Sequence, residues 1–285
     1  MPRTCTINGP AAPIQIGSGR PLAIIAGPCV LESKALALDI ARTLKACCDQ
    51  LGLPYIFKAS FDKANRTSIS SSRGPGLAAG LETLAYIREE LAVPVTTDIH
   101  EPAQAEAVAA VADLLQIPAF LCRQTDLLLA VARAAQSHNR AVNIKKGQFL
   151  SPQEMVGPVA KVESAGCANI ILTERGTFFG YHRLVNDFIG MGDLMELGDA
   201  ANACPVCFDA THSAQLPGAS STTGGRPERV PLLARAAVAA GVHAVFLECH
   251  PDPRNAQSDA STMLALDEAP ALIRSLAAIR KAVCG

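Results

Sequence analysis

The chain has 285 residues, of which 49% are hydrophobic and 18% charged, and its formal net charge is −1. Because there is no basic excess and only 4% of residues are aromatic, we expect no nucleic-acid partner. With no visible signal peptide and no apolar run long enough to cross a bilayer, we expect a cytoplasmic protein without a membrane partner.

The first twenty residues predict a β-hairpin. Two short apolar stretches, Thr4–Ile7 and Ile14–Ile16, flank a longer loop that starts with Asn8-Gly9 and contains proline. Asn-Gly followed by a second apolar stretch is typical of a hairpin turn. We expect this hairpin to cap the bottom of the domain that follows.

The rest of the chain alternates between strand and helix patterns. Near-continuous apolar strands are predicted at 22–28, 55–59, 95–99, 114–118, 141–145, 169–174, 205–210 and 244–249. Segments with helical spacing lie at 34–51, 77–91, 102–112, 124–137, 152–164, 227–240 and 262–283. Such alternation indicates a parallel sheet covered on its faces.

We therefore predict an α/β protein, a (β/α)8 TIM barrel in which residues 1–285 form a single domain. The alternative is an open doubly wound sheet. That fold usually carries a glycine-rich phosphate turn after its first strand, and neither G-x-G-x-x-G nor a Walker motif occurs here.

The segment 56–76 concentrates cations and hydroxyl groups directly after a predicted strand. Lys58, Lys63, Arg66 and Arg73 stand among serines, Asn65 and Thr67. Charged and polar donors of this kind suit a small anion with several negative charges. The alternative is a solvated surface loop, but a loop that leaves a buried strand more often carries function.

Polar or ionisable residues follow every predicted strand, and in a barrel these ends meet at one mouth, where active sites lie. Lys58, Lys63, Arg66, Lys145 and Arg175 would make that mouth strongly positive, which suits two phosphates and a carboxylate. Some of these cations could instead form structural ion pairs with Asp98 and Glu174. Lys146 should face away, because consecutive strand residues point to opposite faces.

A second set of residues could bind a metal ion. Cys29, His212, Glu248 and Asp259 follow strands that adjoin one another in a closed barrel. Mixed sulfur, nitrogen and oxygen donors suit Fe²⁺, Zn²⁺, Mn²⁺ or Co²⁺ better than Mg²⁺. Of the ten cysteines we expect the rest to be reduced filler, and we give Cys204-Pro-Val-Cys207 no redox role because it does not open a helix.

The motifs resemble one family over nearly the whole chain, the 3-deoxy-D-manno-octulosonate 8-phosphate synthases. The matching segments are IAGPCVLES (25–33), FDKANRTS (61–68), TTDIHEP (96–102), LLQIPAFLCRQTDL (114–127), VNIKKGQF (142–149), ILTERG (171–176), FDATHS (208–213), ECHPDP (248–253) and SDAST (258–262). The related heptulosonate synthases carry a Lys-Pro-Arg-type motif in place of FDKANRTS. The resemblance implies that phosphoenolpyruvate and arabinose 5-phosphate condense, with release of phosphate, for lipopolysaccharide biosynthesis.

The resemblance also implies a role for each matching residue. Lys58 and Lys63 would lie along phosphoenolpyruvate and the aldehyde end of the sugar. The phosphate of phosphoenolpyruvate would be bound by Gln116, the Ala119 backbone, Lys145 and Arg175. The sugar phosphate would be bound by Asn65, Arg66 and Thr67, and by Arg123 of a neighbouring subunit in a homotetramer.

The family divides into metal-dependent and metal-free branches, which carry cysteine or asparagine at the position of Cys29. With Cys29, His212, Glu248 and Asp259 all present, the chain resembles the metal-dependent branch. In the reaction, C3 of the enol phosphate would attack the aldehyde and water would add at C2. Asp98 is our candidate for a proton carrier.

Other functions are compatible with the sequence. Lys58 or Lys145 could act as the Schiff-base nucleophile of a class I aldolase. The barrel could also bind sugar phosphates without turning them over, or it could be a sister synthase that makes a heptulosonate or a nonulosonate. The segment 213–226 is rich in serine and glycine, and we expect it to close over the mouth of the barrel.

Overall fold

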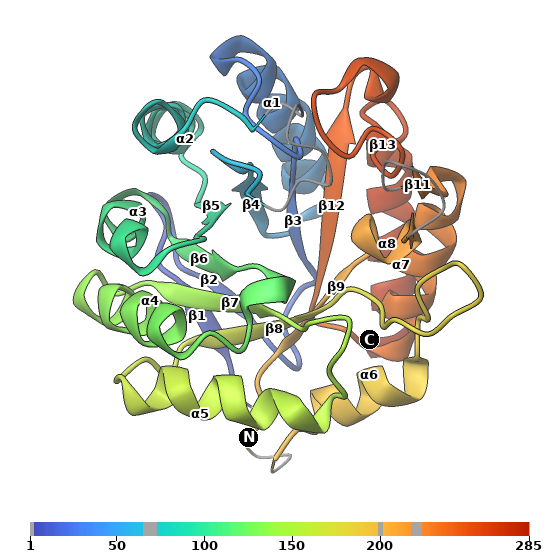
Figure 1. Cartoon of the computed structure of the whole chain (residues 1–285). Helices are drawn as coiled ribbons and strands as arrows, with labels where there is room; N and C mark the ends of the chain where they lie inside the picture. The colour runs from blue at the N-terminus through green and yellow to red at the C-terminus, as the bar shows by residue number, and fades with distance from the viewer. Residues whose placement is uncertain (1–2, 65–72, 199–201, 218–223, 285) are drawn as a thin grey trace.

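The computed structural model describes residues 3–64, 73–198, 202–217 and 224–284, and it confirms the predicted barrel (Figure 1). Eight parallel strands pair in the order β3, β4, β5, β6, β7, β8, β9, β12, and β12 pairs with both β9 and β3, which closes the sheet. Their bounds are β3 Ala23–Gly27, β4 Tyr55–Lys58, β5 Val95–Asp98, β6 Leu114–Ile117, β7 Ala141–Lys145, β8 Ile170–Glu174, β9 Val206–Asp209 and β12 Ala244–His250.

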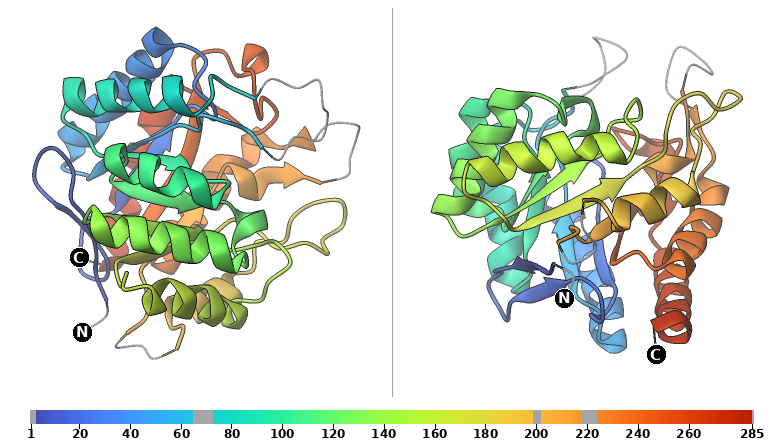
Figure 2. Two further views of the ribbon diagram at one scale, coloured as in Figure 1. Left: turned by 60° about the vertical axis from the view of Figure 1, so that its left-hand side comes forward. Right: turned by 90° about the horizontal axis from the view of Figure 1, so that it is seen from below.

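Helices surround the sheet on its outer side (Figure 2). They are α1 Lys34–Leu51, α2 Leu77–Leu91, α3 Ala105–Val111, α4 Thr125–Ser137, α5 Val156–Ser164, α6 Phe188–Met195, α7 Val230–Ala240 and α8 Ala269–Cys284. None of these helices, within the part of the chain that is described, has the length and apolarity needed to cross a membrane.

Helix α1 shows how the sequence sets its own boundaries. The Ser33 side chain accepts a hydrogen bond from the backbone N–H of Leu36, which caps the start of the helix. Gly52 ends it in a left-handed conformation, with φ of 63°. Ile40 and Leu44, one turn apart, are buried against the sheet, so one apolar face holds the helix in place.

Two parts of the helical prediction were wrong. No helix was expected between β8 and β9, but α6 lies there; its Gly190 and Gly192 have low helix propensity and hid the pattern. The last helix was expected from residue 262 and begins at Ala269. The residues before it form β13 (Leu264–Ala265), which pairs with the end of β12, and Pro270 marks the first helical turn.

The predicted N-terminal hairpin is present and packs into the barrel. β1 (Cys5–Ile7) pairs with β2 (Ile14–Ile16) in antiparallel register. The side chains of Cys5, Ile7 and Ile16 join the inner apolar core. Asn169, at the start of β8, receives a hydrogen bond from Thr6 N and donates one to Thr6 O. The hairpin therefore closes the end of the barrel where the strands begin.

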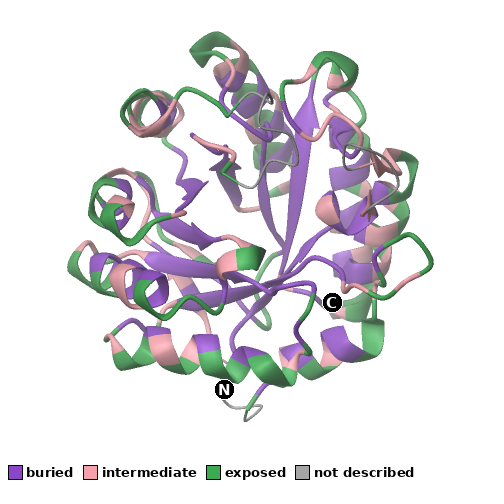
Figure 3. Cartoon of the chain, in the orientation of Figure 1, coloured by how far each residue is buried: buried purple, intermediate pink, exposed green. Residues whose placement is uncertain are grey.

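The core has two layers, as expected when alternate strand residues face opposite sides. Inside the barrel lie small and medium side chains such as Ile25, Ile56 and Ile171, with Phe246 above them. A larger layer fills the space between the strands and the helices. Figure 3 shows the strands buried along their length, with exposed residues on the outer faces of the helices. The polar residues at the carboxyl ends of the strands are the exception to this apolar interior.

The segment after β9 contains a short hairpin, β10 (Gln215–Leu216) and β11 (Gly224–Gly225), which pair in antiparallel register. Of the segment 213–226, which was expected to close over the mouth, residues 218–223 lie outside the described residues, so the closure stays a prediction.

His243 gives the fold a predicted acid sensitivity. It lies just before β12, and its Nδ1 accepts a hydrogen bond from Val206 N at 2.9 Å. Burial and the nearby Arg280 lower the pKa of His243 to about 4 from 6.5. The folded protein therefore binds this proton less readily than the unfolded chain. The contribution of neutral His243 to the free energy of unfolding should be fully present above pH 6.5. It should be lost as the pH falls towards 4, by on the order of 1–3 kcal/mol.

Denaturant unfolding between pH 4 and pH 7 measures this effect. His243→Asn keeps a hydrogen-bond acceptor for Val206 N but does not titrate, so its stability should depend less on pH over this range. Parallel pH profiles for the two proteins would show that another group causes the acid sensitivity.

Candidate active site

The carboxyl ends of the strands surround a cavity of about 230 Å³. Most of the residues expected at the mouth line it: Lys58, Lys63, Asp98, Gln116, Ala119, Lys145, Arg175, His212 and Asp259. His100, Gln148 and Gln215 line it as well. The closed barrel thus brings together side chains that are far apart in the sequence, from Lys58 to Asp259.

Other expected residues do not line this cavity. Cys29 and Glu248 are buried beside it, next to His212 and Asp259. Arg123 is exposed outside the cavity, and its backbone carbonyl accepts a hydrogen bond from Lys161. The residues expected to bind the sugar phosphate, Asn65, Arg66 and Thr67, lie outside the described residues.

Lys58 and Glu248 form a fully buried ion pair. Lys58 Nζ lies 2.5 Å from Glu248 Oε1 and donates to the Cys29 carbonyl at 3.2 Å. Lys63 Nζ approaches the same carboxylate oxygen at 3.9 Å. Burial raises the pKa of Glu248, but the charges of Lys58, His212 and Lys63 outweigh that effect and hold it at about 2. Glu248 is therefore ionised at neutral pH.

Asp209, which was not among the predicted site residues, forms a second buried ion pair with Lys145 and also contacts His212. Asp209 Oδ2 lies 2.6 Å from Lys145 Nζ and 2.7 Å from His212 Nδ1. The other oxygen accepts the His212 backbone N–H at 2.9 Å. Because Nδ1 donates to this carboxylate, Nε2 of the neutral imidazole carries a lone pair. The signal in the sequence is the spacing Asp-x-x-His, Asp209 to His212, directly after a strand.

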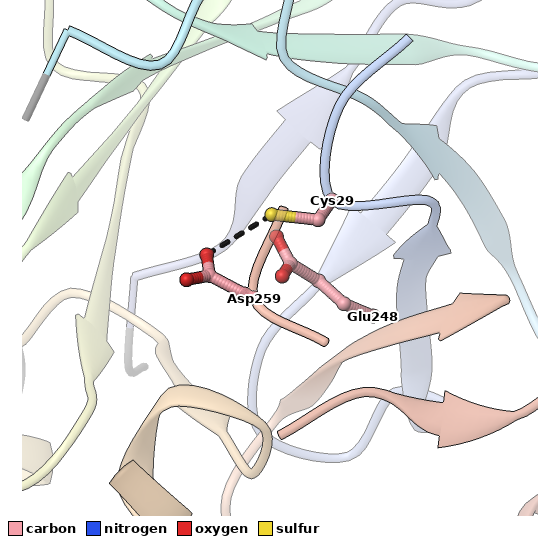
Figure 4. Close-up of side chains that lie close together, drawn as sticks. All are labelled: Cys29, Glu248 and Asp259. Carbon is pink, nitrogen blue, oxygen red and sulfur yellow. Dashed lines mark hydrogen bonds between the residues drawn. The ribbon is translucent and has the colours of Figure 1, made fainter. Parts of the chain in front are cut away.

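The predicted metal ligands meet in space (Figure 4). The ligand atoms of Cys29, Glu248 and Asp259 all lie within 4.8 Å of one another, and Cys29 Sγ is 3.0 Å from Asp259 Oδ2. His212 Nε2 stands 3.7 Å from Glu248 Oε2 and 3.8 Å from Asp259 Oδ2. The four side chains come from the ends of β3, β9 and β12 and from the loop after β12.

These residues fit a divalent cation. Glu248 Oε2 is buried and has no hydrogen-bond partner among the described residues. Burial, together with Asp259 and Glu248, raises the pKa of the Cys29 thiol well above its usual value. A buried acceptor without a donor and a thiol among carboxylates are both unfavourable alone, and a cation between them would satisfy both. The donor set also matches the one that binds first-row transition metals.

Arg175 supplies an unused donor to the cavity. The residue is buried, and its Nη2 donates to Gln215 Oε1 at 2.6 Å. Its Nη1 is also buried but has no partner in the described part of the chain. A guanidinium that lines a cavity with a free N–H suits phosphate or carboxylate oxygen.

Lys146, by contrast, has a structural role. Its Nζ lies 3.3 Å from Glu174 Oε2 and donates to the Leu150 carbonyl and to Thr177 Oγ1. It does not line the cavity. This agrees with the expectation that Lys145 and Lys146 point to opposite faces. The ion-pair partner of Glu174 is Lys146, and not one of the mouth cations for which such a pair was considered.

Comparison with known proteins identifies the family. A family model described as "DAHP synthetase I family" matches residues 5–283. The chain belongs to this family. A 2-dehydro-3-deoxyphosphooctonate aldolase from a Cyanothece species is 52% identical over 271 residues, covering 95% of this chain and 96% of the relative. Proteins of the same name from Syntrophotalea carbinolica (50% identical; 100% and 99% covered) and Caulobacter vibrioides (51% identical; 93% and 90% covered) also match. The resemblance drawn from the motifs is thereby confirmed.

Family membership and the cavity together predict that inorganic phosphate binds at Arg175. Phosphate should raise the melting temperature, because a ligand that binds only the folded state stabilises it. Arg175→Ala removes the free N–H donor and should weaken phosphate binding by roughly 10–100-fold, the usual effect of losing a hydrogen bond to a charged group. Thermal melts over a phosphate series measure this.

The control is Arg42→Ala, which removes an exposed arginine paired with Glu90 on the outer surface of α1. Its response to phosphate should equal that of the unaltered protein. Equal responses in all three proteins would contradict anion binding at Arg175.

Proposed function

We propose that this chain is a 3-deoxy-D-manno-octulosonate 8-phosphate synthase, a transferase of lipopolysaccharide biosynthesis in the cytoplasm. It condenses phosphoenolpyruvate with D-arabinose 5-phosphate and water and releases inorganic phosphate. The observation that carries the proposal is the group of buried cations Lys58, Lys145 and Arg175 around one cavity. Relatives about 50% identical over almost the full chain carry the name of this activity. The single catalytic domain would comprise residues 1–285.

The cavity would hold phosphoenolpyruvate among its cations. Gln116, the Ala119 backbone, Lys145 and Arg175 line one continuous surface and would bind its phosphate. Lys58 and Lys63 would lie along the rest of the molecule and at the aldehyde of the sugar. Two anionic substrates repel each other in water, and fixed cations remove this repulsion while orienting them. Such proximity can contribute on the order of 7–11 kcal/mol to lowering the barrier.

The sugar phosphate would be bound by Asn65, Arg66 and Thr67, which lie outside the described residues. Arg123 of a neighbouring subunit would assist in a homotetramer. Its exposed position outside its own cavity is compatible with a contribution to another subunit.

In the reaction, C3 of phosphoenolpyruvate attacks the aldehyde carbon and C2 gains cationic character. Water adds at C2, and the hemiketal phosphate collapses to a ketone and phosphate with cleavage of the C–O bond. Asp209 holds Lys145 and His212 in fixed orientation through this sequence. Glu248 holds Lys58 in the same way.

Asp98 is our candidate for the proton carrier. It lines the cavity and accepts hydrogen bonds on both oxygens, from Ser60 and Gln116. Each oxygen keeps a further lone pair beside its hydrogen bond, so Asp98 could accept a proton without breaking either bond.

The proposed cofactor is a divalent first-row metal ion, Fe²⁺, Zn²⁺, Mn²⁺ or Co²⁺. Cys29, His212, Glu248 and Asp259 would hold it, and it would supply Lewis acidity to orient the aldehyde or the water. The support is the unpartnered Glu248 Oε2 and the convergence of the four side chains.

The geometry disfavours a class I aldolase. Lys58 and Lys145 each lie within 2.6 Å of a buried carboxylate, so either amine would have to leave this ion pair before it could attack a carbonyl carbon. A Schiff-base nucleophile must be neutral. Borohydride with substrate should therefore trap no adduct on either lysine.

The deciding assay incubates phosphoenolpyruvate and arabinose 5-phosphate with the protein, with and without a chelator. We expect the eight-carbon sugar acid and phosphate in equal amounts, with activity lost on chelation and restored by a divalent first-row ion. In ¹⁸O-water the label should enter the C2 oxygen of the sugar acid. Formation of no sugar acid, even after metal is added back, would disprove the proposed function, and label only in phosphate would disprove the mechanism.

The metal site can be tested apart from catalysis. Binding of Co²⁺ to a thiolate produces near-ultraviolet charge-transfer absorption. We expect this absorption in the unaltered protein and its loss in Cys29→Ser, because the serine hydroxyl cannot supply the sulfur donor. Absorption titration with Co²⁺ under anaerobic conditions measures it.

The matched control is Cys249→Ser. Cys249 neighbours Glu248 on β12 but faces the outer core layer. Its Co²⁺ spectrum should be unchanged. A thiolate band that survives in Cys29→Ser would remove Cys29 from the metal site.

A further inference from the structure

A chain of hydrogen bonds between buried polar side chains runs across neighbouring strands below the cavity. Ser60 Oγ donates to one oxygen of Asp98 and Gln116 Nε2 to the other. Asn143 Nδ2 donates to Gln116 Oε1 at 2.9 Å, and Thr173 Oγ1 donates to Asn143 Oδ1 at 2.6 Å. These side chains come from the ends of β4 to β8 and all are buried.

The charge of Asp98 fixes the direction of every bond in this chain. Burial raises the pKa of Asp98, but Lys58, Lys63 and the nearby imidazole of His100 outweigh it and hold the pKa well below its usual value. An ionised carboxylate only accepts hydrogen bonds. The Gln116 amide must therefore turn its NH₂ group towards Asp98 and its oxygen away.

The same logic passes along the strands. Because Gln116 Oε1 is an acceptor, Asn143 must present its NH₂ group to it, and Asn143 Oδ1 then needs a donor. Thr173 Oγ1 supplies that donor. Every member is satisfied only in this one arrangement, and a partly satisfied buried network is costly.

Gln116 is the member of this chain, besides Asp98, that reaches the cavity. Its Nε2 carries a second hydrogen beyond the one given to Asp98. With the amide held in this orientation, Gln116 offers an N–H to a ligand in the cavity. The reversed amide would offer an oxygen, which would repel both Asp98 and a bound anion.

We propose that Asn143 and Thr173, which do not line the cavity, are positioning residues that hold Gln116 as a hydrogen-bond donor to the phosphate of phosphoenolpyruvate. The proposal rests on the proposed function for the identity of the ligand. Thr173, which is two hydrogen bonds away from the Gln116 side chain, would thereby contribute to specificity for an anion. Neither residue touches the substrate, so their effect on binding passes through Gln116.

The test compares Thr173→Val with Thr173→Ser. Valine has the shape of threonine but cannot donate, so Asn143 Oδ1 loses its partner and the Asn143 amide becomes free to rotate. Gln116 Oε1 then loses its fixed donor, and Asp98 alone orients the Gln116 amide. The equilibrium dissociation constant for phosphoenolpyruvate, measured by calorimetry, should rise by roughly 10–100-fold, as expected for a lost hydrogen bond to a charged group. The KM for phosphoenolpyruvate should rise with it, and the KM for arabinose 5-phosphate should change little. Thr173→Ser restores the hydroxyl and should restore binding.

Thr97→Val is the matched control. Thr97 is equally buried on β5, and its hydroxyl has no hydrogen-bond partner among the described residues. The same substitution there should leave phosphoenolpyruvate binding unchanged, which separates the hydrogen-bond chain from a general effect of valine in the barrel.

The outcomes separate this inference from the proposed function. Weaker phosphoenolpyruvate binding in Thr173→Val alone, rescued by serine, supports the positioning role even if the unaltered protein makes no sugar acid. Equal binding in Thr173→Val and Thr97→Val, or failure of serine to rescue, overturns it even if the synthase activity is present.

Discussion

The active site depends on buried carboxylates that hold several cations close together. Lys58 is paired with Glu248, and Lys145 with Asp209, at 2.5 and 2.6 Å. Burial removes the hydration of these ammonium groups and brings like charges together. The carboxylates offset both effects. Removing one carboxylate would leave an uncompensated buried charge, which is strongly destabilising. The carboxylates therefore make a binding site for anions compatible with a folded core.

The same carboxylates link the cations that line the cavity to the proposed metal ligands. Glu248 contacts Lys58 through Oε1, while its Oε2 has no hydrogen-bond partner among the described residues and lies next to Cys29 and Asp259. Asp209 joins Lys145 to His212. Each carboxylate thus belongs to both halves of the site, so the positions of the cations and of the metal ligands cannot vary independently. Asp98 orients uncharged side chains instead: it accepts a hydrogen bond from Gln116, and Gln116 in turn accepts one from Asn143.

Much of the fold follows from local patterns. The strands and most helices were predicted within a few residues, because continuous apolar runs and helical periodicity are properties of neighbouring residues. The failures have local causes as well. The glycines of α6 hid its helical pattern, and the residues before Pro270 were read as helix although they pair with β12. Within the site, the polar residues at the strand ends were predictable from the convergence of parallel strands.

The sequence by itself determined most of the described residues that line the mouth of the barrel, since they follow strands and strand ends meet there. Arg123, which was also expected there, is exposed outside the cavity. It also separated Lys145 from Lys146, because alternate residues face opposite sides of a strand. Only the tertiary structure decided which charges pair. Asp209 Oδ2 lies 2.6 Å from Lys145 Nζ and 2.7 Å from His212 Nδ1, and both contacts depend on how the barrel folds. Pairing energies depend on distances of a few ångströms and on burial, and neither quantity is encoded in any short stretch of the chain.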